Sequence, residues 1–199
     1  MGTVAAMRIF LAGASGVIGR RLLPLLVGAG HDVAGLTRSA ARSDELAAAG
    51  ATPVVADVYD AETLTAAVVA FGPDAVLHQL TDLPDDAAEL PAYRDRNARM
   101  RREGTANLLA AARAAGAERI VAQSVAWQLT GEGAAAVEAL ETSVLDARGV
   151  VVRYGQFYGP GTFHPDGPPD HPRIHIDDAA TRTLPALTMA PGILTVIED

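Results

Sequence analysis

The sequence predicts an α/β fold: a doubly wound parallel sheet of about seven strands with helices on both faces. Short apolar runs typical of strands alternate along the chain with longer segments of helical periodicity. The strand-like runs are almost continuously apolar, as expected for strands buried on both faces. Crossovers between parallel strands are right-handed, which favours a doubly wound sheet over a mixed one. Neither a repeat nor a linker divides the chain, so one domain over residues 1–199 is expected.

The apolar pattern, together with the residues that end helices and strands, predicts the position of each element in order. The expected strands cover residues 7–12, 32–37, 52–56, 74–79, 119–124, 149–153 and 193–197. The expected helices lie near residues 16–29, 41–49, 61–71, 92–116, 132–147 and 177–188. Gly30 suits a left-handed cap after the first helix, and Asp60 suits the start of the third. The segment 159–173 holds three glycines and five prolines without periodicity, which predicts a loop.

The composition excludes several classes of protein. A formal net charge of -8 argues against a nucleic-acid partner, which requires a basic surface. The absence of cysteine excludes disulfides and thiolate metal sites, and no metal site is expected. The first apolar run, residues 9–12, is too short for a secretory signal, and no stretch approaches the ~20 apolar residues of a membrane span. We therefore expect a cytoplasmic protein without a membrane partner.

All 16 basic residues are arginine, and the chain has no lysine. Five of the arginines are clustered: Arg94, Arg96, Arg99, Arg101 and Arg102. The cluster is interpreted either as the solvated face of a helix or as a contact for an anionic substrate. The sequence leaves both interpretations open.

A glycine-rich motif follows the first expected strand and leads into the first helix. It reads Gly13-Ala14-Ser15-Gly16-Val17-Ile18-Gly19. Glycines at such a junction let backbone N–H groups approach a pyrophosphate, and the helix N-terminus adds partial positive charge. The motif therefore predicts a dinucleotide coenzyme in a Rossmann-like fold. The expected binding residues are Gly13, Ser15, Gly16, Val17 and Ile18.

The ends of the following strands predict the remaining contacts with the coenzyme. Arg38 and Ser39 stand where an acidic residue would bind the adenosine 2′-hydroxyl, and arginine there can hold a 2′-phosphate instead. NADP(H) is therefore favoured over NAD(H). Two further pairs end the third and fourth strands, where the adenine amine and the ribose would lie: Asp57 with Val58, and Gln79 with Leu80.

These residues resemble the extended or atypical short-chain dehydrogenase/reductase superfamily, in its NAD-dependent epimerase/dehydratase branch. The glycine spacing GxxGxxG is the variant of that superfamily, and Ser124 follows the fifth strand as its serine does. Three later segments also match: Gly104–Leu109 resembles "GTxNLL", Arg153–Pro160 resembles "R-x-x-N-x-Y-G-P", and Ile174–Asp178 resembles "hHVDD". The resemblance covers nearly the whole chain.

The chain departs from the superfamily at its catalytic residues. In the superfamily a serine, a tyrosine and a lysine four residues later carry hydride chemistry. Here the tyrosine and lysine positions fall near Gly133 and Val137, which cannot transfer a proton. Arg101 also stands where the superfamily often has an asparagine. Loss of a positioned proton-transfer group costs on the order of 10²–10⁴ in rate.

Two residues are therefore the candidates for catalysis. Ser124 is expected to contact the substrate or the coenzyme, and Tyr154 is the candidate for a replacement proton donor beside the coenzyme. The resemblance implies an NAD(P)(H)-binding oxidoreductase or epimerase that acts on a small carbonyl or hydroxyl substrate with a non-standard catalytic set. A non-redox cyclase, isomerase or dehydratase and a nucleotide-binding regulatory subunit are the alternatives. A homodimer is left open.

Overall fold

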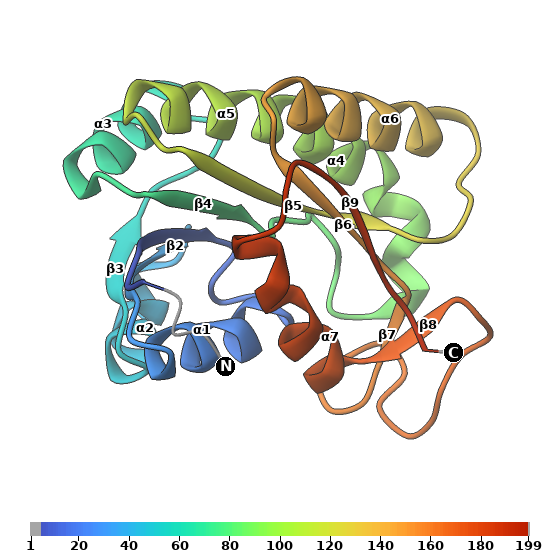
Figure 1. Ribbon diagram of the computed structural model, residues 1–199. Coiled ribbons are helices and arrows are strands. Elements are labelled where there is room, and N and C mark those ends of the chain that lie inside the picture. The colour runs from blue at the N-terminus through green and yellow to red at the C-terminus, as the bar shows by residue number, and fades with distance from the viewer. Residues whose placement is uncertain (1–4, 199) are drawn as a thin grey trace.

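The computed structural model describes residues 5–198 and shows a central sheet between two layers of helices (Figure 1). In spatial order the strands are β3 (Thr52–Val55), β2 (Asp32–Thr37), β1 (Arg8–Ala12), β4 (Ala75–His78), β5 (Arg119–Val125), β6 (Val150–Tyr154) and β9 (Gly192–Val196). All neighbours pair in parallel. The chain reverses its direction of winding between β1 and β4, where ligands of such sheets bind at the carboxyl ends. The predicted fold and its seven strands are confirmed.

Each face of the sheet has its own layer of helices and its own core. The helices α1 (Gly19–Gly28), α2 (Ser43–Ala48) and α7 (Ile176–Thr183) lie on one face, and α3 (Ala61–Phe71), α5 (Thr105–Ala114) and α6 (Gly131–Asp146) on the other (Figure 1). Side chains alternate along β1, so that Leu11 packs toward α1 and Phe10 toward α3 and α5. None of the helices in the described residues is long and apolar enough to span a bilayer.

The boundaries of two helices show how the sequence sets them. Asp60 caps α3, accepting a hydrogen bond from the Thr63 N–H at 3.1 Å, as predicted. Gly30 follows α1 with φ +88°, which confirms the expected left-handed cap. The start of α1 differs from the prediction, because the first helical residue is Gly19 rather than Gly16.

The predicted long helix over residues 92–116 is a series of four helical segments. These are η2 (Ala87–Tyr93), α4 (Arg94–Arg99), η3 (Met100–Gly104) and α5. The η3 segment is a π-helix, which is rare and often found at functional sites. The apolar pattern predicted the helix but carried no signal for this local widening.

Two strands were not predicted. β7 (Gln156–Tyr158) and β8 (Arg173–His175) form a separate parallel pair beside α7. The predicted loop 159–173 is therefore confirmed up to residue 172, and Arg173 begins a strand. Two short helices complete the described chain: η1 (Ala40–Arg42) precedes α2, and η4 (Leu184–Leu187) follows α7.

Candidate coenzyme and substrate site

The glycine motif forms a tight loop between β1 and α1. Gly13 has φ +91°, and a Cβ there would lie 2.6 Å from the Gln79 carbonyl oxygen at the end of β4. A Cβ at Gly19 would lie 2.0 Å from the Gly13 carbonyl oxygen. The Gly16 N–H donates to that same oxygen at 3.0 Å, which closes the turn. Only glycine fits at Gly13 and Gly19, and Ser15, Val17 and Ile18 therefore present their backbone at the N-terminus of α1.

The end of β2 lies against this loop. Ser15 Oγ is 3.5 Å from Thr37 Oγ1, and the Ser39 N–H donates to Thr37 Oγ1 at 3.2 Å. Arg42 donates from Nη1 to the Ser15 carbonyl at 3.0 Å. The Arg38 side chain is 52% exposed, and its nearest carboxylate oxygen, Asp82 Oδ1, is 3.9 Å away. The Arg42 guanidinium thus contacts the glycine loop, and the Arg38 guanidinium is only loosely paired.

The end of β3 is held by a residue whose role the sequence did not reveal. Asn107 of α5 donates from Nδ2 to the Val58 carbonyl at 2.9 Å. Asp57 Oδ1 accepts a hydrogen bond from the Tyr59 N–H at 2.9 Å. Asn107 belongs to the segment that resembles "GTxNLL". Its hydrogen bond fixes the position of Val58, at the end of the strand expected beside the adenine.

The end of β4 carries unpaired polar atoms at the centre of the site. Gln79 is buried, and neither side-chain amide atom has a hydrogen-bond partner in the described part of the chain. Its backbone lies against Gly13, and the next carbonyl, of Leu80, accepts a hydrogen bond from Gln123 at 3.1 Å. Unpaired buried polar groups are costly unless a ligand or water completes them. The glycine cradle and the Gln79 amide therefore fit a bound dinucleotide.

Ser124 belongs to a polar network on the α6 side of the sheet. Its Oγ donates to Glu141 Oε1 at 2.6 Å, and Arg153 Nε donates to the same oxygen at 2.9 Å. The register of the sheet creates this network, because Ser124 and Arg153 are opposite one another on β5 and β6. Burial acts to raise the pKa of Glu141, but hydrogen bonds from Arg153 and Ser124 outweigh it and hold that pKa below its usual value.

Tyr154 lies in the core, and its role as a replacement proton donor stays a prediction. Its hydroxyl is 2.6 Å from Thr183 Oγ1, and its ring packs at 5.1 Å from that of Phe157. Burial raises the pKa of Tyr154 well above its ordinary value. The Tyr154 side chain points to the same face of the sheet as that of Val152, into the core between the sheet and helices α1 and α7. Polar contacts with Thr183 and Gln79 act to lower the pKa of Tyr154, so its hydroxyl lies near the Gln79 amide.

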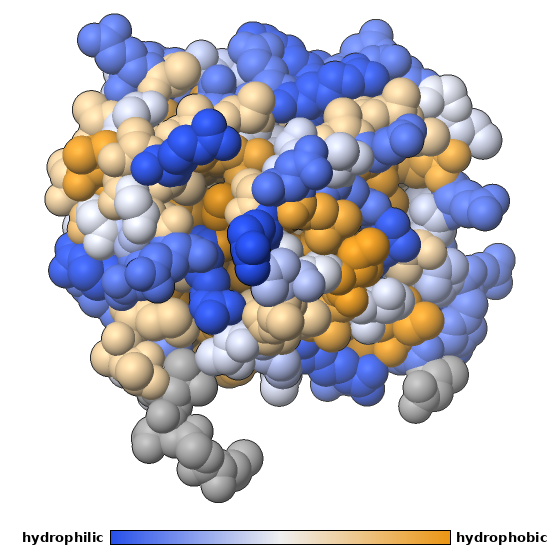
Figure 2. Space-filling view, turned by 45° about the horizontal axis from the view of Figure 1, so that its top comes forward, coloured by the Kyte–Doolittle hydropathy of each residue, from blue (hydrophilic) through white to orange (hydrophobic). Residues whose placement is uncertain are grey.

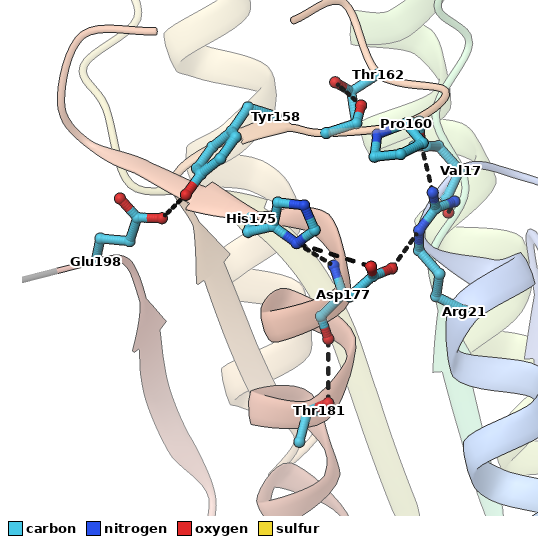
Figure 3. Close-up of polar contacts among 10 residues, drawn as sticks. Val17, Arg21, Tyr158, Pro160, Thr162, His175, Asp177, Thr181 and Glu198 are labelled. Carbon is cyan, nitrogen blue, oxygen red and sulfur yellow. Dashed lines mark hydrogen bonds and ion pairs between the residues drawn. The ribbon is translucent and has the colours of Figure 1, made fainter. Parts of the chain in front are cut away.

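A second polar cluster connects the glycine loop to the β7–β8 pair, as Figure 3 shows. Arg21 of α1 donates to the carbonyls of Val17 and Pro160, and its Nε is 2.9 Å from Asp177 Oδ1. His175 caps α7 by accepting a hydrogen bond from the Asp177 N–H at 3.3 Å. Arg21 therefore joins the glycine loop to the segments that resemble "Y-G-P" and "hHVDD".

A groove with a volume of about 600 Å³ runs between α6 and the β6–β9 edge of the sheet. Its apolar lining includes Trp127, Leu129, Val137, Leu145 and Ile193. Glu141 and Arg153 lie along it as well, so the groove borders the Ser124 network. Apolar side chains are exposed between charged groups in the view that brings the α5–α6 side forward (Figure 2). Val137, near the position where the superfamily's lysine is expected, thus lines a groove.

Comparisons with known proteins agree with this geometry. Residues 13–148 match a family model described as NAD(P)H-binding. A 3-diazoavenalumate denitrifying reductase of a Streptomyces species is 36% identical over 237 aligned positions, which cover 97% of this chain and 76% of that protein. The alignment is longer than this chain, so that relative has insertions. A ketoreductase of Stigmatella aurantiaca, named for a 4-farnesyl-dihydroquinoline-1-oxide substrate, is 36% identical over 58% of this chain and 32% of its own length.

Solved structures show the same fold. The UDP-glucose 4-epimerase of Thermus thermophilus in complex with NAD has a TM-score of 0.77 at 23% identity, over 96% of this chain and 78% of that one. The UDP-Glc/GlcNAc 4-epimerase of Campylobacter jejuni has a TM-score of 0.79 at 15% identity, over the same shares of the two chains. The scaffold is that of NAD(P)-binding reductases and epimerases.

Proposed function

The chain belongs to the NAD(P)H-binding family, in the extended or atypical short-chain dehydrogenase/reductase branch, and we propose that it is an NADPH-dependent reductase. The substrate carbon accepts a hydride and loses a leaving group, so that the protein need not supply a proton. When bound, the coenzyme supplies that hydride. One observation carries the proposal: in a chain with a glycine cradle for a coenzyme, the only hydroxyl proton of Ser124 is donated to Glu141.

The coenzyme-binding residues are assigned by their positions at the carboxyl ends of the strands. Backbone N–H groups of Gly13 to Ile18 hold the pyrophosphate at the N-terminus of α1. Asp57 and Val58 hold the adenine, and Gln79 and Leu80 hold the nicotinamide ribose. Arg38, Ser39 and Arg42 favour the 2′-phosphate of NADPH because a guanidinium forms paired, charge-assisted hydrogen bonds with phosphate oxygens.

The Ser124 network indicates the kind of substrate. Because Ser124 donates its one proton to Glu141, its oxygen can only accept a hydrogen bond from a further group. A carbonyl substrate needs a donor for the oxygen on which negative charge develops, and the superfamily's tyrosine and lysine are missing here. A substrate that releases dinitrogen has no such requirement. The C–N bond breaks, dinitrogen leaves with its electron pair, and the incoming hydride forms the new C–H bond.

The name of the Streptomyces relative describes a reductase that removes nitrogen from a diazo compound. We therefore propose aromatic diazonium compounds as the substrate class. The test is to incubate the protein with a benzenediazonium salt and NADPH deuterated at the transferable position. We expect deuterium in the arene product and faster NADPH oxidation than in a reaction without protein. Deuterium-free product formed equally well without nicotinamide would instead select the non-redox alternative.

Replacement of the serine should have only a small effect on the rate. We expect Ser124→Ala to lower kcat by about tenfold or less, because no proton passes through its hydroxyl. Glu141→Gln serves as the companion variant, since the amide that it introduces could donate to the serine and free its proton. Both are measured by steady-state kinetics across pH. A loss of 10²-fold or more in the alanine variant, on the order expected for a missing proton donor, would contradict the proposed chemistry.

The choice between the two coenzymes should depend on Arg38. Arg38→Gln is expected to raise the Kd for NADPH about 10- to 100-fold, because a charge-assisted hydrogen bond contributes about 1.5–3 kcal/mol. The Kd for NADH should change little. Titration of Trp127 fluorescence measures both constants, with Arg113→Gln, an exposed position at the end of α5, as the matched control. Equal losses for the two coenzymes would contradict a role in 2′-phosphate binding.

A further inference from the structure

Arg101 differs from the other arginines of its cluster. Arg94, Arg96, Arg99 and Arg102 are exposed, as expected for a solvated helix face, whereas Arg101 is partly buried. Arg96, Arg99 and Arg102 pair with Asp82, Glu103 and Glu132, respectively. Arg101 has no hydrogen-bond or ion-pair partner among residues 5–198. It lies on η3, the π-helical segment.

The neighbours of Arg101 on its helical face show where that face is directed. Four residues earlier, Asn97 is buried and its Oδ1 accepts a hydrogen bond from the Asp82 N–H at 3.1 Å. Four residues later, Thr105 Oγ1 is 2.9 Å from His78 Nε2. Residues four apart share one helix face. Arg101 is thus placed between a residue that contacts His78, the last residue of β4, and a residue that contacts Asp82, four positions later.

The environment of this guanidinium favours an anionic ligand. Burial lowers the pKa of Arg101, and no carboxylate compensates for the lost hydration. A desolvated charge without a partner is costly, and binding of an anion removes that cost. The pyrophosphate of a coenzyme is expected at the glycine loop and α1, on the opposite face of the sheet from η3 and α5 (Figure 1). The pyrophosphate is therefore not expected to reach Arg101, and the affinity for NADPH is measured separately in the test below.

We propose that Arg101 is a specificity-determining residue that binds a carboxylate of the substrate, so that the substrates are organic acids. The proposal rests on the reductase function above and narrows its substrate class. A guanidinium presents its donors in a planar fork that matches the two oxygens of a carboxylate. A lysine offers no such fork and would transfer its proton more readily. Arg101 thus anchors the acid beside the end of β4 without taking part in proton transfer.

The test measures binding and activity separately. Benzoate and its neutral analogue benzamide are titrated into the NADP⁺ complex by calorimetry, with the Arg101→Gln, Arg101→Lys and Arg94→Gln variants. We expect the Kd for benzoate to rise at least about tenfold in Arg101→Gln, and less in Arg101→Lys, which keeps the charge but loses the fork. Arg94→Gln, an exposed position in the same helical series, should bind benzoate like the wild type. The Kd for NADPH should stay within about twofold throughout.

Activity provides the second readout. For a diazonium substrate with a ring carboxylate, Arg101→Gln should raise KM about tenfold with little change in kcat, while the corresponding amide substrate is unaffected. The proposal is overturned if the wild type binds benzoate no better than benzamide. It is also overturned if Arg101→Gln loses affinity for NADPH as much as for benzoate. Arg101-dependent benzoate binding without any reductase turnover would leave the anion site standing and refute the reductase function alone.

Discussion

Gly19→Ala is expected to abolish coenzyme binding, with the Kd for NADPH rising at least about 100-fold. The added methyl group would lie 2.0 Å from the Gly13 carbonyl oxygen and 2.9 Å from Ala14 backbone atoms. These are backbone atoms of the loop itself, so relief requires the cradle to open. Opening moves the N–H groups that bind the pyrophosphate away from the N-terminus of α1. Fluorescence titration with NADPH, together with circular dichroism to confirm folding, measures the effect.

Two other glycines provide controls within the same region. At Gly28, the last residue of α1, a Cβ meets nothing within 4 Å, so Gly28→Ala should keep coenzyme affinity and raise stability by about 0.5–1 kcal/mol. At Gly16 the added carbon would be 3.2 Å from the Gly13 carbonyl oxygen, a milder clash that should give an intermediate Kd. If Gly19→Ala folds and binds NADPH like Gly28→Ala, the loop is not the coenzyme cradle and the assignment of the site is wrong.

The strands and the glycine loop were predictable because their causes are local. Continuous apolar runs specify buried parallel strands, and glycines at a strand–helix junction specify the loop. β7 and β8 escaped prediction because each has only three residues and they flank a loop rich in glycine and proline. Such short strands have no periodicity to read, and they are defined by a pairing across the intervening loop that the sequence does not reveal.

The side-chain network around Ser124 shows the same limit at the candidate site. The serine was predictable from its place after a strand, but Glu141 and Arg153 reach it from α6 and β6 through the register of the sheet. Arg101 shows the opposite case. The sequence suggested contact with an anionic substrate for the arginine cluster as a whole. Only the structure shows that Arg101 is partly buried and so differs from its solvated neighbours.

The orientation of Tyr154 was within reach of the sequence. Residues two apart on a strand point to the same face, and Val150 and Val152 precede it on β6. All three belong to the core beneath α1 and α7. The tyrosine was predicted as a proton donor because the end of β6 is expected to lie near the coenzyme. The alternation of side chains along β6 places its ring in the core.

The stability of the protein should fall steeply in mild acid because of His78. This imidazole is fully enclosed at the end of β4, with Nε2 2.9 Å from Thr105 Oγ1 and Nδ1 accepting a hydrogen bond from the Leu80 N–H at 3.3 Å. Burial lowers its pKa from 6.5 to about 4. In the unfolded chain the His78 imidazole therefore binds a proton below pH 6.5, whereas in the folded protein it binds one only below about pH 4. The free energy of unfolding should drop by about 3 kcal/mol across that interval.

Urea denaturation at a series of pH values between 7 and 4 tests this expectation against His78→Gln. The variant removes the titrating group, so its stability should decline less on acidification, by about 3 kcal/mol, even if it is less stable at neutral pH. His164→Gln, on the 159–172 loop, is the matched control and should follow the wild type. Protonation of carboxylates such as Glu141, whose pKa lies below its usual value, also lowers the free energy of unfolding in acid. This loss is the same in every variant, so it cancels when their stabilities are compared. Parallel curves for the wild type and His78→Gln would show that the buried imidazole does not govern acid stability. A separation that opens below pH 6.5 would show that the contact between β4 and the start of α5, beside the Arg101 face, depends on a neutral histidine.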